Sequence, residues 1–229
     1  MAFIMGNIGF RIYTAIKRPP RELVEQFAGI PVANFSDNMG RMACIDTAIK
    51  PFNGATLLGV AFTVKAPQGD NLMFHKALDM AEPGDVIAVD GEGDLSHSLC
   101  GEIMFTYAKS RGIAGFIIDG AIRDSYAIRE MDFPVYARGV QPNGPYKNGP
   151  GEIGVPVCIG GRVVRPGDIL YGDADGVVVI RPEDAEEMLI KGRAHNAMEQ
   201  ESFRQIAAGV YDRSWIDKAL TEKGCEIII

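Results

Sequence analysis

Several patterns that mark common classes of protein are missing from this sequence. Its four cysteines are far apart in the chain and form no Cys-x-x-Cys pair, which excludes a zinc ribbon and a thioredoxin-like motif. No apolar run approaches the ~18 residues that a membrane span requires. The N-terminus has an apolar start but neither the basic region nor the long apolar stretch of a signal peptide. We therefore expect a soluble, cytoplasmic protein with no membrane partner.

Positive charge is also scarce. The 23 Lys and Arg residues are outnumbered by 30 Asp and Glu residues, which leaves a net charge of −7 and argues against a surface that binds nucleic acid. An anionic metabolite would therefore need a local cationic group, such as a metal ion or a single Arg. The chain has only three histidines, and none forms the His-x3-His pair of a zinc-binding helix. The fingerprints of dinucleotide-binding domains and of phosphate-binding loops are missing as well.

What the sequence does contain is an alternation of strands and helices. Strands are predicted at 55–64, 86–90 and 115–119, and helices at 21–27, 71–81 and 101–111. Strands so short and so apolar indicate a sheet that is covered on both faces. The sequence therefore predicts an α/β fold, and 229 residues are most simply accommodated in a single compact domain.

The part of the chain after Pro134 has a different character. A Gly- and Pro-rich loop at 141–151 is followed by short strands, which predict β-hairpins rather than further crossover units. These strands are expected around Val155, Val163, Ile169 and Val177. Pro182 and the acidic residues after it open a helix. The predicted organisation is one domain over residues 1–229, with a C-terminal helical extension over about 182–229.

Two segments that follow predicted strands carry the candidate chemistry, and ligands of α/β proteins bind at such places. In the first, Gly101 opens a helix and leaves the backbone N–H groups of Glu102, Ile103 and Met104 available to a carboxylate or phosphate. In the second, Arg123 offers a positive fork for an anionic oxygen, and Asp124 offers a hard oxygen ligand for Mg²⁺ or Mn²⁺. Glu102 supplies a second carboxylate that can act as a base.

Each of these residues also has a plainer interpretation. Arg123 and Asp124 can belong to a surface set of ion pairs, and Glu102 can simply cap its helix. Lys147, in the Gly- and Pro-rich loop, can reach a distal carboxylate of a substrate or can be an ordinary surface lysine. His195 and Glu199, one helical turn apart, can face a neighbouring subunit or can form a solvated pair.

A family resemblance favours the catalytic interpretation. Glu102, twenty intervening residues and then Arg123-Asp124 resemble the Asp/Glu-x20-Arg-Asp signature of class II pyruvate aldolases related to 4-hydroxy-4-methyl-2-oxoglutarate aldolase. Further stretches, at 112–124, 134–139, 160–168 and 173–179, are similar to the same superfamily, which includes the regulator of ribonuclease E activity (RraA). The likeness spans roughly residues 20–195.

The resemblance implies a fold and a set of ligand contacts. It implies an RraA-like swivelling β/β/α domain in a ring-like homotrimer or homohexamer. It further implies that Asp124 ligates a divalent metal cation, Mg²⁺ or Mn²⁺, and that Arg123 contacts the pyruvyl part of the substrate. The substrate carboxylate would be held at the turn of Gly101 by the backbone amides of Ile103 and Met104. Glu102 would position the substrate, or remove a proton from it, through a water molecule. A neighbouring subunit would add acidic groups, for which Asp37 and Glu199 are the candidates.

The expected reaction is metal-dependent retro-aldol cleavage of a 4-hydroxy-4-methyl- or 4-carboxymethyl-2-oxoglutarate-type substrate. Removal of the C4 hydroxyl proton breaks the C3–C4 bond and releases pyruvate and a second 2-oxo acid. Arg123 can stabilise the oxyanion that develops. Oxaloacetate decarboxylation gives the same enolate and is the expected side activity, and the resemblance places such chemistry in aromatic compound catabolism. Two alternatives stay open: a dedicated oxaloacetate decarboxylase, and a non-catalytic regulatory protein of the RraA type that binds a partner protein.

Overall fold

The structure is a computed structural model, and it describes residues 7–228. The chain divides between Gly192 and Arg193 into two compact units. The first unit holds the sheets and the helices that pack on them, and the second consists of the rest of the last long helix and one further helix. The predicted arrangement of one domain over residues 1–229 stays a prediction.

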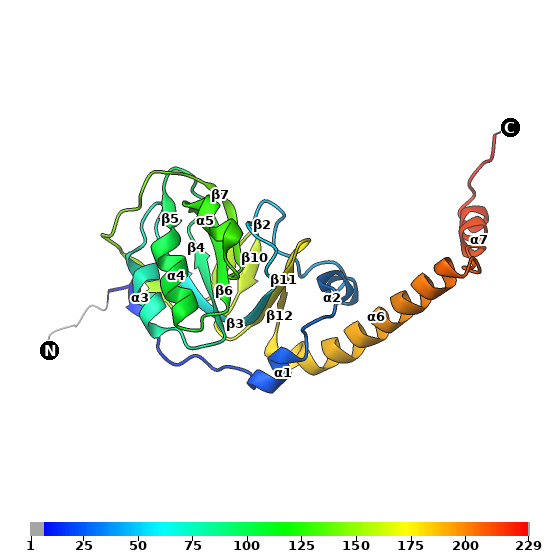
Figure 1. Cartoon of the computed structure of the whole chain (residues 1–229), viewed down its shortest axis with the longest axis horizontal. Coiled ribbons are helices and arrows are strands. Elements are labelled where there is room, and N and C mark those ends of the chain that lie inside the picture. The colour runs from blue at the N-terminus through cyan, green and yellow to red at the C-terminus, as the bar shows by residue number, and fades with distance from the viewer. Residues whose placement is uncertain (1–6, 229) are drawn as a thin grey trace. The chain divides into compact units, whose positions relative to one another are not determined.

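A mixed sheet of ten strands forms the centre of the first unit (Figure 1). Its parallel core consists of β3 (Leu57–Lys65), β4 (Asp85–Asp90), β6 (Gly115–Ile122) and β7 (Val135–Val140). Shorter strands complete it, namely β1 (Phe10–Ile12), β2 (Lys50–Pro51), β5 (Ser98–Cys100), β8 (Gly151–Ile153), β11 (Ile169–Asp173) and β12 (Gly176–Ile180). Every residue of β4 and β6 is buried, so the predicted cover on both faces of the sheet is confirmed.

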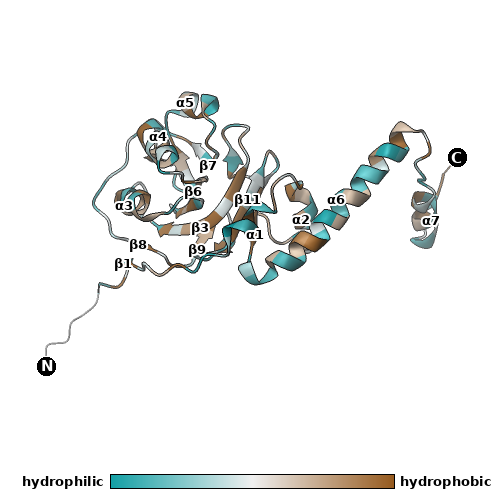
Figure 2. Cartoon of the chain, turned by 60° about the horizontal axis from the view of Figure 1, so that its bottom comes forward, coloured by the Kyte–Doolittle hydropathy of each residue, from teal (hydrophilic) through white to brown (hydrophobic). Residues whose placement is uncertain are grey.

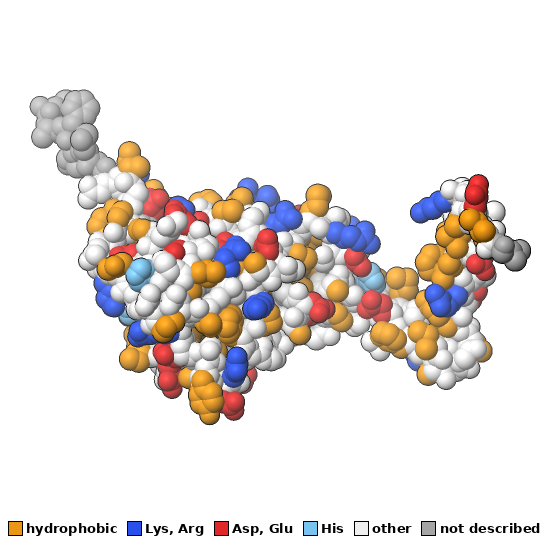
Figure 3. Space-filling model, turned by 90° about the horizontal axis from the view of Figure 1, so that it is seen from above, with side chains coloured by type: hydrophobic (Ala, Val, Ile, Leu, Met, Phe, Trp, Pro, Cys, Tyr) orange, Lys and Arg blue, Asp and Glu red, His pale blue; other side chains and the backbone are white. Residues whose placement is uncertain are grey.

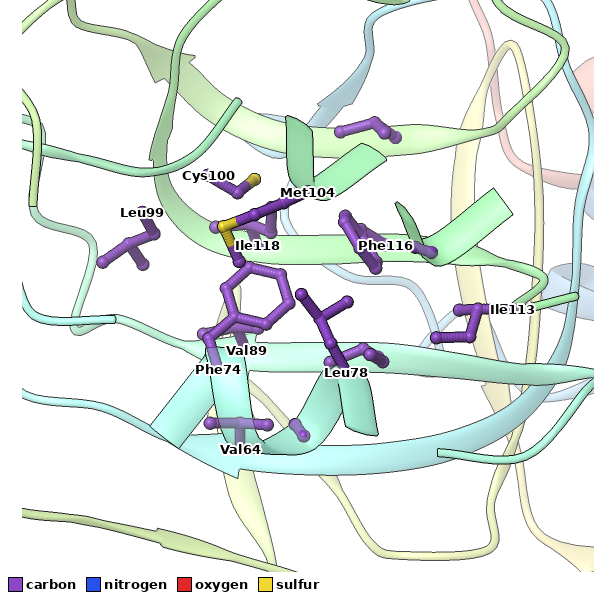
Figure 4. Close-up of a cluster of buried hydrophobic side chains, with 14 of the residues drawn as sticks. Val64, Phe74, Leu78, Val89, Leu99, Cys100, Met104, Ile113, Phe116 and Ile118 are labelled. Carbon is purple, nitrogen blue, oxygen red and sulfur yellow. The ribbon is translucent and has the colours of Figure 1, made fainter. Parts of the chain in front are cut away.

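Three helices cover one face of this sheet: α3 (Leu72–Met80), α4 (Glu102–Ser110) and α5 (Ser125–Glu130). Because successive residues of a strand point to opposite faces, one alternate set of strand residues packs under the helices. Figure 4 shows Phe74 and Met104 of the helices gathered with Val89 and Ile118 of the sheet. The ring of Phe116 lies 5.0 Å, centroid to centroid, from that of Phe74.

The opposite face carries a second sheet made of β9 (Val157–Ile159) and β10 (Arg162–Val164). Buried carboxylates tie the two sheets together, because Asp119 accepts a hydrogen bond from Gly160 N at 2.7 Å and Asp90 accepts one from Cys158 N at 3.3 Å. The layers therefore follow the order sheet, sheet, helices. The α/β class and the swivelling β/β/α arrangement expected from the RraA-like resemblance are confirmed; the ring-like oligomer stays a prediction.

A third hydrophobic cluster closes the end of the first unit (Figure 2). It packs the hairpin of β11 (Ile169–Asp173) and β12 (Gly176–Ile180) against α1 (Arg21–Glu25), α2 (Val32–Asn38) and the start of α6 (Ala185–Ala207). A 3₁₀ turn, η1 (Pro182–Asp184), leads into α6 as the Pro182 signal predicts. In the second unit, α7 (Trp215–Glu222) follows. Within the described residues, no helix is both long enough and apolar enough to cross a membrane.

The hairpins predicted after Pro134 are confirmed for β9–β10 and β11–β12, but two other expectations are wrong. The segment opens with another crossover unit, because α5 leads into β7 and β7 runs parallel to β6. The six residues of α5 are too few to display a helical period in the sequence. Val155 lies between β8 and β9 rather than in a strand.

Candidate functional site

The two segments that carry the candidate residues lie side by side at one edge of the sheet. The first leads from β5 into α4, and the second leads from β6 into α5. Strand β5 pairs in parallel with the end of β6, and Arg123 N donates a hydrogen bond to the carbonyl oxygen of Cys100 at 2.9 Å. Carboxyl ends of neighbouring parallel strands meet at the same edge, which is why the turns at Gly101 and Asp124 come together.

Asp124 joins the two turns through its side chain. Its Oδ2 atom accepts a hydrogen bond from Glu102 N at 2.9 Å and lies 3.7 Å from Nε of Arg123. Its backbone has a left-handed φ of 55°, a conformation that aspartate tolerates better than most residues. The side chains of Arg123 and Asp124 keep 45% and 43% of their surface exposed, so both can reach a ligand that arrives from solvent.

Gly101 permits this close approach. A Cβ atom at this position would overlap Oδ2 of Asp124 and would lie 2.9 Å from Cγ of Arg123. The φ of Gly101 is −155°, which is ordinary extended backbone, so glycine is required by lack of space and not by backbone strain. Any side chain at this position would displace the carboxylate or the guanidinium.

A small cavity of about 220 Å³ opens beside these turns. It is lined by Asn71, His75, Cys100, Gly101, Ile103, Met104, Arg123, Asp124, Pro145 and Lys147. Pockets for drug-sized ligands occupy roughly 300–1,000 Å³, so this cavity suits a small metabolite. Its charged side chains are two cations, Arg123 and Lys147, and one carboxylate, Asp124.

Two titratable groups in the cavity are held neutral near pH 7. Burial raises the pKa of the Cys100 thiol well above its usual value, and the negative charge of Asp124 raises it further. Burial lowers the pKa of His75, and the positive charge of Lys147 lowers it further. Neither group therefore adds charge to the cavity at neutral pH, and its charged side chains are those of Arg123, Asp124 and Lys147.

The structure brings most of the predicted site residues together. Gly101, Ile103, Met104, Arg123 and Asp124 all line the cavity. The side chain of Glu102 is exposed and is not among the lining residues, and its backbone N–H is engaged with Asp124. Met104 N donates to the carbonyl oxygen of Gly101 at 2.9 Å, so its amide would have to exchange that bond for a substrate carboxylate. The assigned roles stay predictions.

The two residues assigned to a neighbouring subunit have partners of their own. Asp37, on α2, lies 3.1 Å from Nε of Arg41. Glu199, on α6, lies 3.8 Å from Nε2 of His195, one helical turn before it. Their contribution to the site of another subunit stays a prediction.

Reasoning from the sequence missed one wall of the cavity. Asn71 stands just before α3, donates from Nδ2 to the carbonyl oxygen of Leu99 at 2.8 Å, and has a buried Oδ1 atom with no partner among the described residues. His75 lies one helical turn further on. A signal was present, because this helix follows β3 at the same edge of the sheet.

The residues present fit a weakly held divalent cation rather than a metal cage. Among the described residues, no group of three or more His, Cys, Asp or Glu side chains is gathered as a metal site. Mg²⁺ keeps several waters and is commonly bound by one or two carboxylates together with its substrate. Asp124 offers such a carboxylate, half-exposed and in a cavity that is also lined by Arg123 and Lys147.

A three-layered α/β fold, with a cavity lined by Arg123, Asp124 and Lys147 at the ends of its parallel strands, defines the class of this protein. The RraA-like family model, described as Aldolase/RraA, matches residues 32–179, and the chain belongs to this family. A protein of Halalkalibacterium halodurans, named provisionally as a 4-hydroxy-4-methyl-2-oxoglutarate aldolase, is 38% identical over 201 residues. This match covers 87% of this chain and 96% of the relative.

Solved structures of the family are similar as well. The RNA-processing inhibitor RraA from Thermus thermophilis is 31% identical with a TM-score of 0.61, and the match covers 66% of this chain and 92% of that one. RraAS2 from Streptomyces coelicolor, described as an unusual member of the RNase ES inhibitor RraA family, is 27% identical. Its TM-score is 0.74, with 82% of this chain and 100% of that chain covered. The family thus contains proteins named for catalysis and proteins named for inhibition.

Proposed function

We propose that this protein is a divalent-metal-dependent aldolase. The substrate is a 2-oxo acid of the 4-hydroxy-4-methyl- or 4-carboxymethyl-2-oxoglutarate type, which is cleaved to pyruvate and a second 2-oxo acid, with oxaloacetate decarboxylation as a side activity. The observation that carries the proposal is the convergence of Arg123 and Asp124 on the side-chain-free turn of Gly101, within one small cavity. A protein that only binds another protein has no need of this arrangement.

Each group has a chemical task in this reaction. A divalent cation such as Mg²⁺ or Mn²⁺, held by Asp124, would supply a Lewis acid that polarises the C2 carbonyl. The C1 carboxylate would bind near the amide of Ile103, at the positive end of α4. Arg123 stabilises the negative charge that develops on the C2 oxygen.

The bond changes follow from proton removal. Glu102, acting through a water molecule, takes the proton of the C4 hydroxyl group. The electrons of that O–H bond form the new C4 carbonyl, the C3–C4 bond breaks, and its electrons form the enolate of pyruvate. Protonation at C3 then yields pyruvate. The cations Arg123 and Lys147 favour the anionic states along this path.

The test is pyruvate release from 4-hydroxy-4-methyl-2-oxoglutarate and from its 4-carboxymethyl analogue, with Mg²⁺ or with EDTA. We expect metal-dependent release in the wild type and loss of release in Asp124→Ala. Asp46→Ala, which changes an exposed aspartate that does not line the cavity and accepts a turn hydrogen bond from Ala48 N, is the matched control and should stay active. Wild type that cleaves neither substrate but decarboxylates oxaloacetate would make this a dedicated decarboxylase.

The RraA structures favour a second candidate, a regulatory protein that binds a partner protein. Absence of turnover on all three substrates, together with stoichiometric binding of an RNA-processing nuclease by Asp124→Ala, would establish that function instead. For the aldolase we further propose a homotrimer or homohexamer in the cytoplasm, in which Asp37 and Glu199 approach the site of a neighbouring subunit.

A further inference from the structure

One wall of the cavity is a loop without regular structure, residues 141–150, that carries Pro145 and Lys147. The backbone on the N-terminal side of Lys147 is well anchored. Tyr146 N donates to the carbonyl oxygen of Gly69 at 2.8 Å, and Asn71 N donates to the carbonyl oxygen of Tyr146 at 3.0 Å. These bonds attach the loop to the segment that opens α3.

The backbone on the other side of Lys147 is held by one buried side chain. Asp70 is only 4% exposed, and its Oδ2 atom accepts hydrogen bonds from Asn148 N at 2.6 Å and from Gly149 N at 3.0 Å. Its Oδ1 atom accepts a third bond, from Leu72 N at 2.9 Å. The carboxylate therefore joins the first turn of α3 to a loop 78 residues further along the chain.

This arrangement leaves Lys147 between two fixed points. Its own side chain is exposed and lines the cavity, while the residues before and after it are tied down. Hydrogen bonds to an ionised carboxylate are about twice as strong as neutral ones, and Asp70 accepts three of them. A long, flexible lysine loses less freedom on binding an anion when its backbone is already fixed.

We propose that Asp70 is a positioning residue, which holds the loop over the cavity so that Lys147 faces the carboxylate of the substrate that is remote from its pyruvyl part. The proposal rests on the proposed function for the identity of that substrate. Asp70 does not touch the substrate. Its effect is transmitted through the backbone of Asn148 and Gly149.

The first test is Asp70→Asn, which turns an amide N–H₂ group toward backbone N–H donors. We expect the KM for 4-hydroxy-4-methyl-2-oxoglutarate to rise about tenfold, the size of effect expected for a lost charge-assisted contact. The kcat for oxaloacetate, which lacks the C5 carboxylate, should change less than twofold. An equal fall in kcat/KM for both substrates would contradict the proposal.

A double-mutant cycle decides whether Asp70 acts through Lys147. If it does, Asp70→Asn combined with Lys147→Ala is no worse than Lys147→Ala alone, whereas independent effects would add. Asp168→Asn is the matched control, because Asp168 is equally buried and its carboxylate accepts a loop hydrogen bond from Arg165 N at 2.8 Å. It should leave the KM unchanged.

Hydrogen exchange tests the clamp without any reliance on activity. The amides of Asn148 and Gly149 should exchange at least tenfold faster in Asp70→Asn than in the wild type, while those of α4 keep their rates. Unchanged exchange would overturn the proposal, even if the enzyme proves to be an aldolase. If the wild type cleaves no substrate, faster exchange still supports the clamp. Should Asp70→Asn fail to fold, Asp70→Ser, which retains an acceptor for the helix, replaces it.

Discussion

The positions of Asp124 and Arg123 depend on the fact that Gly101 has no side chain. Gly101→Ala would force Asp124 or Arg123 away from its position, because the added Cβ overlaps Oδ2 of Asp124. We expect pyruvate release to fall at least a hundredfold, as is common when a catalytic group moves by about 1 Å. Steady-state kinetics of the purified variant is the measurement.

The control for this substitution is Gly54→Ala. Gly54 is exposed, and a Cβ atom there meets nothing within 4 Å, so activity should stay at the wild-type level. Full activity in Gly101→Ala would show that the approach of the two turns is not needed for catalysis. A large fall in melting temperature would instead point to a structural role for the glycine.

His75 provides a pH-dependent signature of the cavity. Burial and the nearby Lys147 lower its pKa from the usual 6.5. At pH values between the lowered pKa and 6.5, the unfolded chain binds more protons than the folded chain. His75 therefore contributes stability above pH 6.5, and this contribution is lost as the pH falls through that range. NMR titration of the His75 ring should give a pKa below 6.5. Lys147→Ala should move this pKa upward without restoring the usual value, and an unchanged pKa would contradict the electrostatic effect of Lys147.

At the scale of elements, the junction of the two sheets depends on Asp119. Its carboxylate accepts hydrogen bonds from Arg138 Nε at 2.6 Å and from Gly160 N at 2.7 Å, and its side chain is only 9% exposed. Asp119→Ala would leave both donors without their partner. We expect a loss of about 3 kcal/mol in the free energy of unfolding, measured by urea denaturation.

The control for Asp119→Ala is a substitution in an exposed ion pair. Asp37 and Arg41 keep 43% and 77% of their side-chain surface exposed, so Asp37→Ala should cost less than about 1 kcal/mol. A loss below about 1 kcal/mol in Asp119→Ala as well would mean that the Asp119 hydrogen bonds contribute little to the junction of the two sheets.

At the scale of the whole molecule, the second unit lacks a hydrophobic core of its own among its described residues. None of the described residues from Arg193 to Ile228 is buried. Phe203 and Trp215 are 60% and 63% exposed, and Figure 3 shows orange, hydrophobic side chains along this unit. Short helices are marginal in water on their own, and apolar surface of this kind marks an interface. This is consistent with the proposed oligomer.

The sole tryptophan reports on this association. In the oligomer we expect Trp215 to resist quenching by acrylamide, and on dilution to monomers it should become accessible. Phe203→Glu should lower the mass measured by sedimentation, whereas Gln200→Glu, a polar change on the same helix, should not. A wild-type monomer at micromolar concentration with a readily quenched tryptophan would contradict the assembly.

The sequence by itself determined the α/β class, the alternating strands of the core and the two segments that meet at the site. These features are local or periodic: apolar runs mark buried strands, and residues that follow neighbouring parallel strands must meet at one edge. The two segments could therefore be located from the sequence, and the family resemblance then singled out Glu102, Arg123 and Asp124 within them.

The tertiary structure alone decided what surrounds these turns. It brought His75 and Lys147 into the same cavity, directed Asp119 to the second sheet, and placed Asp70 against a loop 78 residues away. Such contacts have no period in the sequence, because each depends on how distant segments pack. The sequence around an aspartate does not show whether its carboxylate will be buried or will lie in a surface turn. Only the hydrogen-bond donors that surround the carboxylate in the fold distinguish the two cases.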